Sequence, residues 1–162
     1  IDRSRGLGDV YKRQSKFSRA EELGATHCFD SKNNNIVEEI RDLTNGGVDY
    51  AIDLAGVIQA MDTAYQIIRY GGSVVTAGLS PINTQFSFNH SDLVAQEKSI
   101  LGSYMGSCVP VRDVPRFLNL YKQGRLPVDK LIDGKITFDN LNEGFDKLSK
   151  GEVVRQLLMP NS

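Results

Sequence analysis

The chain has 162 residues, of which 40% are hydrophobic and 24% are charged, and its formal net charge is −1. This length suits about one domain with a single core, and the composition excludes intrinsic disorder, collagen and coiled coil. The small net charge, without a local cluster of Lys and Arg, argues against a nucleic-acid surface. The apolar runs are too short for a membrane span, and no secretory signal pattern is present, so we expect a cytoplasmic protein.

The first fourteen residues, IDRSRGLGDVYKRQ, differ from the rest of the chain because they hold no sustained apolar periodicity. The string resembles the translated adapter sequence found at the ends of assembled metagenomic sequences. We therefore predict that residues 1–14 are non-native or disordered. Gly6 and Gly8 lack the third glycine, the preceding strand and the following helix of a phosphate-binding loop.

From residue 15 onward the apolar spacing changes between helical and strand periods. It predicts a helix over 15–25, a buried strand over 26–30 and a second helix over 36–43. The Asn-Gly-Gly at 45–47 ends the second helix.

The stretch 48–79 predicts a βαβ unit around which the rest of the chain is organised. Two continuous apolar runs, VDYAIDLAG and GGSVVTAGL, flank the amphipathic helix pattern VIQAMDTAYQIIRY. Such runs are typical of parallel strands that are covered on both faces. Both runs end in small residues, Ala55-Gly56 and Ala77-Gly78, at the sheet edge where open α/β folds bind ligands. These residues either leave room for a flat cofactor or only permit tight turns.

Beyond residue 79 the pattern predicts a polar connection, a short helix, a strand and a longer helix over 80–89, 92–98, 100–106 and 113–124. Residues 126–162 then predict a strand, a helix and a last strand. This tail is either the final layer of the same sheet or part of a neighbouring domain. The alternation of helices and strands predicts an α/β fold with a doubly wound parallel sheet.

The residues that most often bind metals are scattered through the sequence. No CxxC and no metal-type spacing joins the two cysteines and two histidines, which are Cys28, Cys108, His27 and His90. Buried thiols and surface imidazoles are therefore favoured over a metal site, and we predict no metal ligands in the chain.

Six segments between residues 16 and 159 resemble, in register, the C-terminal coenzyme-binding half of the zinc-dependent, medium-chain alcohol dehydrogenases. They are KFSRAEELGATHCFD, TNGGVDYAIDLAG, GGSVVTAGL, ILGSYMGS, VPRFLNLYKQGRLPVDKLI and LNEGFDKLSKGEVVRQLLM. The resemblance implies an incomplete Rossmann-type domain over 15–125 and an α+β tail over 126–162 that packs on an absent catalytic domain. It also implies an NAD or NADP cofactor, an alcohol or aldehyde substrate, zinc in the parent enzyme only, and a parent that is a homo-oligomer.

The resemblance also assigns cofactor-binding positions. Those on the adenosine side are Lys16, Leu54, Ala55 and Gly56. Those on the nicotinamide side are Ala77, Gly78, Leu79, Ser103 and Met105, the last two acting through backbone groups. Arg155, in the motif GEVVRQ, would bind the pyrophosphate, for which the planar guanidinium fork is suited. The alternatives are a solvated charge for Lys16, a solvent-facing edge position for Arg155, and packing for the others.

Several parts of the family pattern have no counterpart in the sequence. The zinc ligands, the first strand and the glycine-rich phosphate turn are missing, and the acidic residue that would select NAD or NADP falls at Tyr11. We therefore expect a fragment of an oxidoreductase that is inactive by itself, has no catalytic residue and binds NADH weakly or not at all.

Two other interpretations stay open. One is a zinc-free oxidoreductase of the quinone-reductase type from the same superfamily, and the other is a non-catalytic nucleotide-sensing module. The resemblance to the alcohol dehydrogenases further implies that the tail presents apolar side chains to a catalytic-domain surface that this chain lacks. These side chains are Leu131, Ile136, Phe138 and Leu157.

Overall fold

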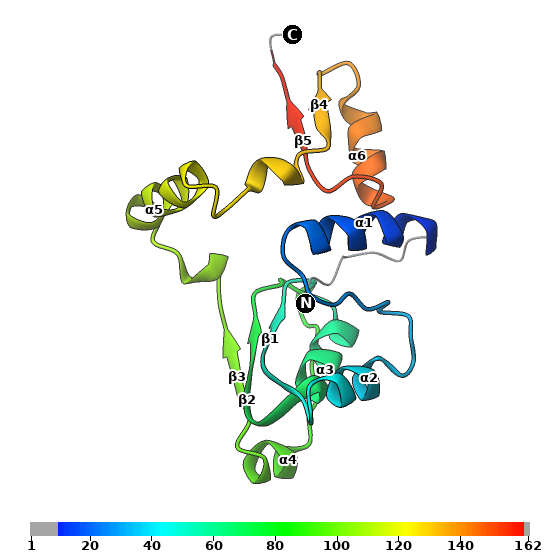
Figure 1. Ribbon diagram of the computed structural model, residues 1–162, viewed down its shortest axis with the longest axis vertical. Coiled ribbons are helices and arrows are strands. Elements are labelled where there is room, and N and C mark those ends of the chain that lie inside the picture. Colours follow the sequence, from blue (N-terminus) through cyan, green and yellow to red (C-terminus); the bar gives the residue numbers. More distant parts are fainter. Residues whose placement is uncertain (1–9, 161–162) are drawn as a thin grey trace. The chain divides into compact units, whose positions relative to one another are not determined.

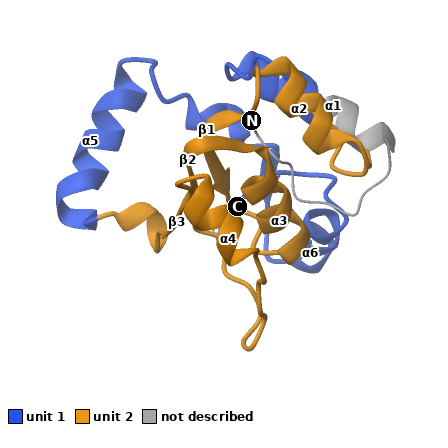
Figure 2. Cartoon of the chain, turned by 90° about the horizontal axis from the view of Figure 1, so that it is seen from below, with its two compact units in different colours: residues 1–28, 109–162 blue, residues 29–108 orange. Residues whose placement is uncertain are grey.

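The computed structural model describes residues 10–160, and the chain divides into two compact units (Figure 2). One unit comprises residues 1–28 and 109–162, and the other comprises residues 29–108. The predicted foreign segment lies partly outside the described residues, and its described part belongs to helix α1 (Val10–Glu22). The origin of that segment therefore stays a prediction, as do the predicted domain boundaries.

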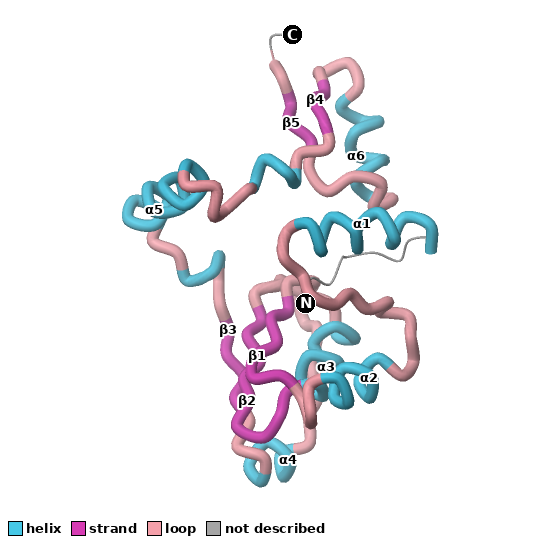
Figure 3. Tube along the Cα trace, in the orientation of Figure 1, coloured by secondary structure: helices cyan, strands magenta, loops and turns pink. Residues whose placement is uncertain are grey.

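The unit of residues 29–108 is built on a three-stranded parallel sheet in the order β1-β2-β3 (Figures 1 and 3). Its strands are β1 (Val48–Asp53), β2 (Ile68–Thr76) and β3 (Ser99–Gly102). Helix α3 (Ile58–Ile67) connects the first two strands, which confirms the predicted βαβ unit. Helices α2 (Ile36–Leu43) and α4 (His90–Ala95) precede β1 and β3. The α/β fold with a parallel sheet is thus confirmed.

The core of this unit lies between one face of the sheet and helices α2 and α3. Its buried members are Ile36, Ile40, Ala51, Met61, Ala64, Tyr65, Ile67, Ile68 and Val74. The other face of β1 is exposed, because Tyr50 and Ile52 alternate with the buried Ala51 and Asp53. The prediction that this strand is covered on both faces is therefore wrong for the structure as described. Helix α3 packs on the Ala51 side of this strand, and the alternating side chains Tyr50 and Ile52 point away from it.

Two predicted strands differ from the observed ones. Residues 26–30 form no strand, because no described strand pairs with them, and a strand is defined by its neighbour's hydrogen bonds. The strand predicted over 100–106 ends at Gly102, and the 3₁₀ turn η1 (Met105–Ser107) follows it. Within this turn Gly106 has a φ of 68°, which an extended strand cannot accommodate.

The other unit contains α1 together with the C-terminal part of the chain. It includes α5 (Pro110–Lys122), η2 (Val128–Leu131), β4 (Gly134–Ile136), α6 (Leu141–Ser149) and β5 (Gln156–Leu158). Strands β4 and β5 pair in parallel as a separate two-stranded sheet. The tail is therefore not the last layer of the β1–β3 sheet. Phe138 is 60% exposed and Leu157 39% exposed, whereas Leu131 and Ile136 are half-buried.

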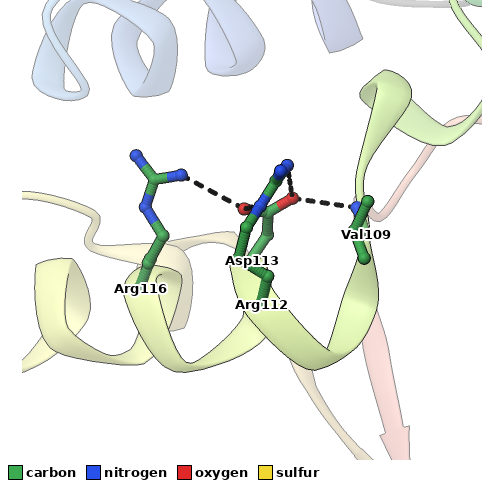
Figure 4. Close-up of polar contacts among 4 residues, drawn as sticks. All are labelled: Val109, Arg112, Asp113 and Arg116. Carbon is green, nitrogen blue, oxygen red and sulfur yellow. Dashed lines mark hydrogen bonds and ion pairs between the residues drawn. The ribbon is translucent and has the colours of Figure 1, made fainter.

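Helix α5 begins one turn earlier than predicted, because Pro110 occupies its first turn. Asp113 closes this turn by accepting the Val109 N–H (Figure 4). The buried Asp113 carboxylate accepts hydrogen bonds from the Val109 N–H and from Arg112, each at 2.8 Å. Arg116 donates a further bond at 3.2 Å. Pro115 consequently lies inside the helix and not in its first turn.

This cluster predicts a dependence of stability on pH. The hydrogen bonds from Arg112 and the Val109 N–H hold the pKa of Asp113 well below its ordinary value. Because the folded pKa lies below the unfolded value of about 3.9, the ionised carboxylate stabilises the fold above that pH. This stabilisation is lost as the pH falls toward the folded pKa. We expect Asp113→Asn to flatten the loss of helical circular dichroism between about pH 4 and pH 2.

The control for this prediction is Asp139→Asn, which removes one carboxylate from an exposed position. It should leave the acid transition of the unsubstituted chain in place. An Asp113→Asn variant whose acid transition coincides with that of the control would contradict the role given to Asp113.

Candidate functional site

The turns that follow β1 and β2 are joined through Asp53, which is only 3% exposed. Its carboxylate accepts the Ala55 N–H at 2.9 Å and the Thr76 hydroxyl at 3.1 Å. Its backbone oxygen accepts the N–H groups of Ala77 at 2.8 Å and Gly78 at 3.2 Å. One buried residue therefore holds the carboxyl ends of two neighbouring strands in a fixed arrangement.

The two glycines at these strand ends allow the turns to touch. A Cβ on Gly78 would lie 2.1 Å from the Gly56 nitrogen, and a Cβ on Gly56 would lie 2.5 Å from the Leu79 oxygen. Gly56 also has a φ of 65°, and its carbonyl accepts the Ser80 hydroxyl at 2.9 Å. Of the two explanations that the sequence leaves open, tight turns account for the missing side chains. Direct contact of these glycines with a cofactor stays a prediction.

The segment that follows β3 contributes Ser103 and Met105 to the same edge. The Ser103 N–H donates to the Thr76 oxygen at 2.9 Å, which places Ser103 beside the end of β2. The Met105 carbonyl accepts the Cys108 N–H at 3.3 Å. The remaining backbone groups of this pair are the Ser103 carbonyl and the Met105 N–H, one acceptor and one donor.

Large apolar side chains at this edge are exposed to solvent. Leu54 is 61% exposed, Leu79 is 76% exposed and Met105 is 69% exposed. They lie beside the backbone donors and acceptors at the ends of the same strands. The structure brings together eight of the predicted residues here: Leu54, Ala55, Gly56, Ala77, Gly78, Leu79, Ser103 and Met105.

The two predicted cations, Lys16 and Arg155, belong to the other unit. Lys16 is half-buried on α1, with its Nζ 3.4 Å from the place that a Gly151 Cβ would take. Arg155 is exposed and directly precedes β5. Lys16 therefore lies at one end of the loop 151–155, and Arg155 is at the other.

Sequence reasoning missed two carboxylates, Asp53 and Asp133. Asp53 could have been noticed, since it is the single charged residue in the otherwise apolar end of the run AIDLAG. Asp133 precedes β4, and its partners on α1 and near β5 are far away in sequence, so no local pattern marks it.

Between residues 10 and 160, no three side chains of His, Cys, Asp or Glu lie together in a way that could hold a metal ion. Among those same residues, no helix combines the length and the apolar character needed to cross a membrane.

A parallel sheet with helical connections places the chain among the open α/β proteins, which bind ligands at the carboxyl ends of their strands. Residues 10–123 match the zinc-binding dehydrogenase family, and the chain belongs to this family. It corresponds to the C-terminal coenzyme-binding half of a medium-chain alcohol dehydrogenase, which confirms the resemblance found in the sequence.

Individual relatives agree with this assignment. Alcohol dehydrogenase 1 of Cenchrus americanus is 31% identical over 147 residues, which are 89% of this chain and 38% of the relative. The crystal structure of benzyl alcohol dehydrogenase from Acinetobacter calcoaceticus matches with a TM-score of 0.84 and 30% identity, over 90% of this chain and 40% of that one.

A third relative is a putative zinc-binding dehydrogenase from Sinorhizobium meliloti, whose crystal structure holds NADP. It matches with a TM-score of 0.79 and 28% identity over 94% of this chain and 43% of that one. The chain thus spans about 40% of the length of the relatives it matches.

Proposed function

We propose that the chain is the coenzyme-binding part of an NAD(P)-dependent, zinc-containing alcohol dehydrogenase. The parent reaction is the reversible transfer of a hydride between an alcohol and the nicotinamide ring. The single observation that supports this most strongly is the edge of the β1–β3 sheet, where Asp53 fixes the strand ends beside exposed apolar side chains. The family of the chain supports the same proposal.

The residues that we assign to the dinucleotide come from both units of the chain. The Ser103 carbonyl would accept a hydrogen bond from the carboxamide of the nicotinamide, and the Met105 N–H would donate one to it. Leu54 and Leu79 offer apolar surface to the rings. Lys16 would bind at the adenosine ribose, and Arg155 would bind two pyrophosphate oxygens through its guanidinium.

The cofactor, when bound, accepts or supplies the hydride, and the residues of this chain bind and orient it. No catalytic residue is assigned in the chain, and we place the zinc ligands of the parent elsewhere in that enzyme. We further propose that the parent is cytoplasmic and forms a homo-oligomer, and that the chain alone is inactive.

The test is to recover the coding sequence that flanks this chain and to purify the complete protein. We expect NAD- or NADP-linked oxidation of simple primary or secondary alcohols that zinc chelation abolishes, while the 162-residue chain alone shows none. Quinone reduction that is insensitive to chelation would instead support the zinc-free reductase. Tight dinucleotide binding without turnover of any substrate would support the nucleotide-sensing module.

A further inference from the structure

Asp133 is bonded both to helix α1 and to the loop 151–155. It lies between η2 and β4, and its side chain is 14% exposed. One carboxylate oxygen pairs with Arg19 of α1 at 2.5 Å. The other accepts the N–H of Val154 and, at 3.2 Å, the N–H of Arg155.

The backbone of Asp133 adds a further bond to the same place. Its N–H donates to the Arg155 oxygen at 2.7 Å. The N–H and the C=O of Arg155 are therefore both bound by a single residue, and the next residue, Gln156, pairs with Gly134 in the parallel sheet. The backbone from which the Arg155 side chain extends is fixed from both sides.

Among the residues that the structure describes, no carboxylate forms an ion pair with the Arg155 guanidinium. Although partial burial raises the pKa of Asp133, the hydrogen bonds from Val154, Arg19 and Arg155 lower it on balance, so the carboxylate is ionised at neutral pH. Its charge is balanced by Arg19, and it touches Arg155 only through the backbone. The guanidinium of Arg155 is left exposed, at the end of the loop whose start lies against Lys16.

We propose that Asp133 is a positioning residue, which holds the loop 151–155 on α1 and so presents the Arg155 guanidinium to the pyrophosphate of the cofactor. This inference rests on the proposed function. Displacement of a charged binding group by about 1 Å weakens binding severely, so a residue that fixes its backbone matters without touching the ligand.

The test compares Asp133→Asn with the unsubstituted complete enzyme. The asparagine keeps the side-chain shape but loses the charge that binds Arg19 and strengthens the bonds to the loop. We expect the KM for the dinucleotide to rise about tenfold with little change in kcat. The Kd of ADP-ribose should rise by a similar factor, whereas the Kd of adenosine, which carries no phosphate, should stay the same.

Glu22→Gln is the matched control. Glu22 pairs with Lys130 at 2.8 Å and also joins α1 to the segment before β4, and among residues 10–160 no hydrogen bond or ion pair links it to the loop 151–155. We expect this variant to bind ADP-ribose as the unsubstituted enzyme does. Arg19→Gln, which removes only the charged partner of Asp133, should raise the Kd of ADP-ribose by a smaller factor, and it serves as the test if Asp133→Asn does not fold.

Three results would overturn the inference while leaving the proposed function intact. They are an unchanged ADP-ribose affinity in the Asp133 and Arg19 variants, an equal loss of adenosine and ADP-ribose binding, and an equal effect of Glu22→Gln. If the unsubstituted complete enzyme bound neither ADP-ribose nor a nicotinamide dinucleotide, the proposed function itself would fail, and the inference with it.

Discussion

Gly78→Ala is expected to unfold the unit of residues 29–108, because the new Cβ would lie 2.1 Å from the backbone nitrogen of Gly56. Asp53 holds the backbone on both sides of this contact, through the Ala55 N–H next to Gly56 and through the Gly78 N–H. The two backbone segments therefore cannot move apart without breaking the hydrogen bonds at the two strand ends. We expect the free energy of unfolding to fall by about 3 kcal/mol or more. Urea unfolding followed by circular dichroism measures this loss.

Gly102→Ala provides the control for this prediction. Gly102 lies at the end of β3, its φ is outside the left-handed region, and nothing lies within 4 Å of the place its Cβ would take. We expect a change of no more than about 0.5 kcal/mol. Equal urea midpoints for the two variants would show that the turns after β1 and β2 are not packed as described.

Arg155→Gln is expected to weaken dinucleotide binding by the complete enzyme. Each hydrogen bond to a charged group contributes about 1.5–3 kcal/mol, and glutamine has neither the charge nor the guanidinium fork. A loss of about 2–3 kcal/mol corresponds to roughly a 30- to 150-fold rise in Kd. Titration calorimetry with NADH measures it directly.

The control for this second prediction is Arg125→Gln, which removes one exposed guanidinium from the same unit, in the turn that follows α5. The NADH affinity of this variant should equal that of the unsubstituted enzyme. If both substitutions weakened binding equally, the effect would come from the overall charge of the enzyme, and Arg155 would have no specific role at the pyrophosphate.

The sequence predicted the central βαβ unit correctly because its signal is local. Continuous apolar runs on either side of a helical period define strand, helix and strand without knowledge of any distant residue. The prediction of a strand over 26–30 is wrong because a strand also depends on residues that are distant in the sequence. A short apolar stretch becomes a strand only when another strand lies beside it, and no described strand pairs with these residues.

The candidate site likewise has features that the sequence predicted and features that only the structure showed. The apolar runs located the strand ends at Gly56 and Gly78, but they could not show that the two glycines touch each other. The resemblance to a family singled out Arg155 but not Asp133, since the bonds of Asp133 to Arg19 and to Val154 span 114 and 21 positions of the chain.

The amino-acid sequence by itself determined the alternation of helices and strands, the family, and the chemical types of the residues at the sheet edge. Periodicity and motifs depend on residues that are close together in the sequence, so they can be recognised without a structure. Only the tertiary structure decided that Asp53 joins two strand ends and that the tail forms its own two-stranded sheet. It also decided that Asp133 holds the backbone of Arg155. These features depend on atoms that folding brings within about 3 Å of one another from distant positions, and no local pattern encodes such a distance.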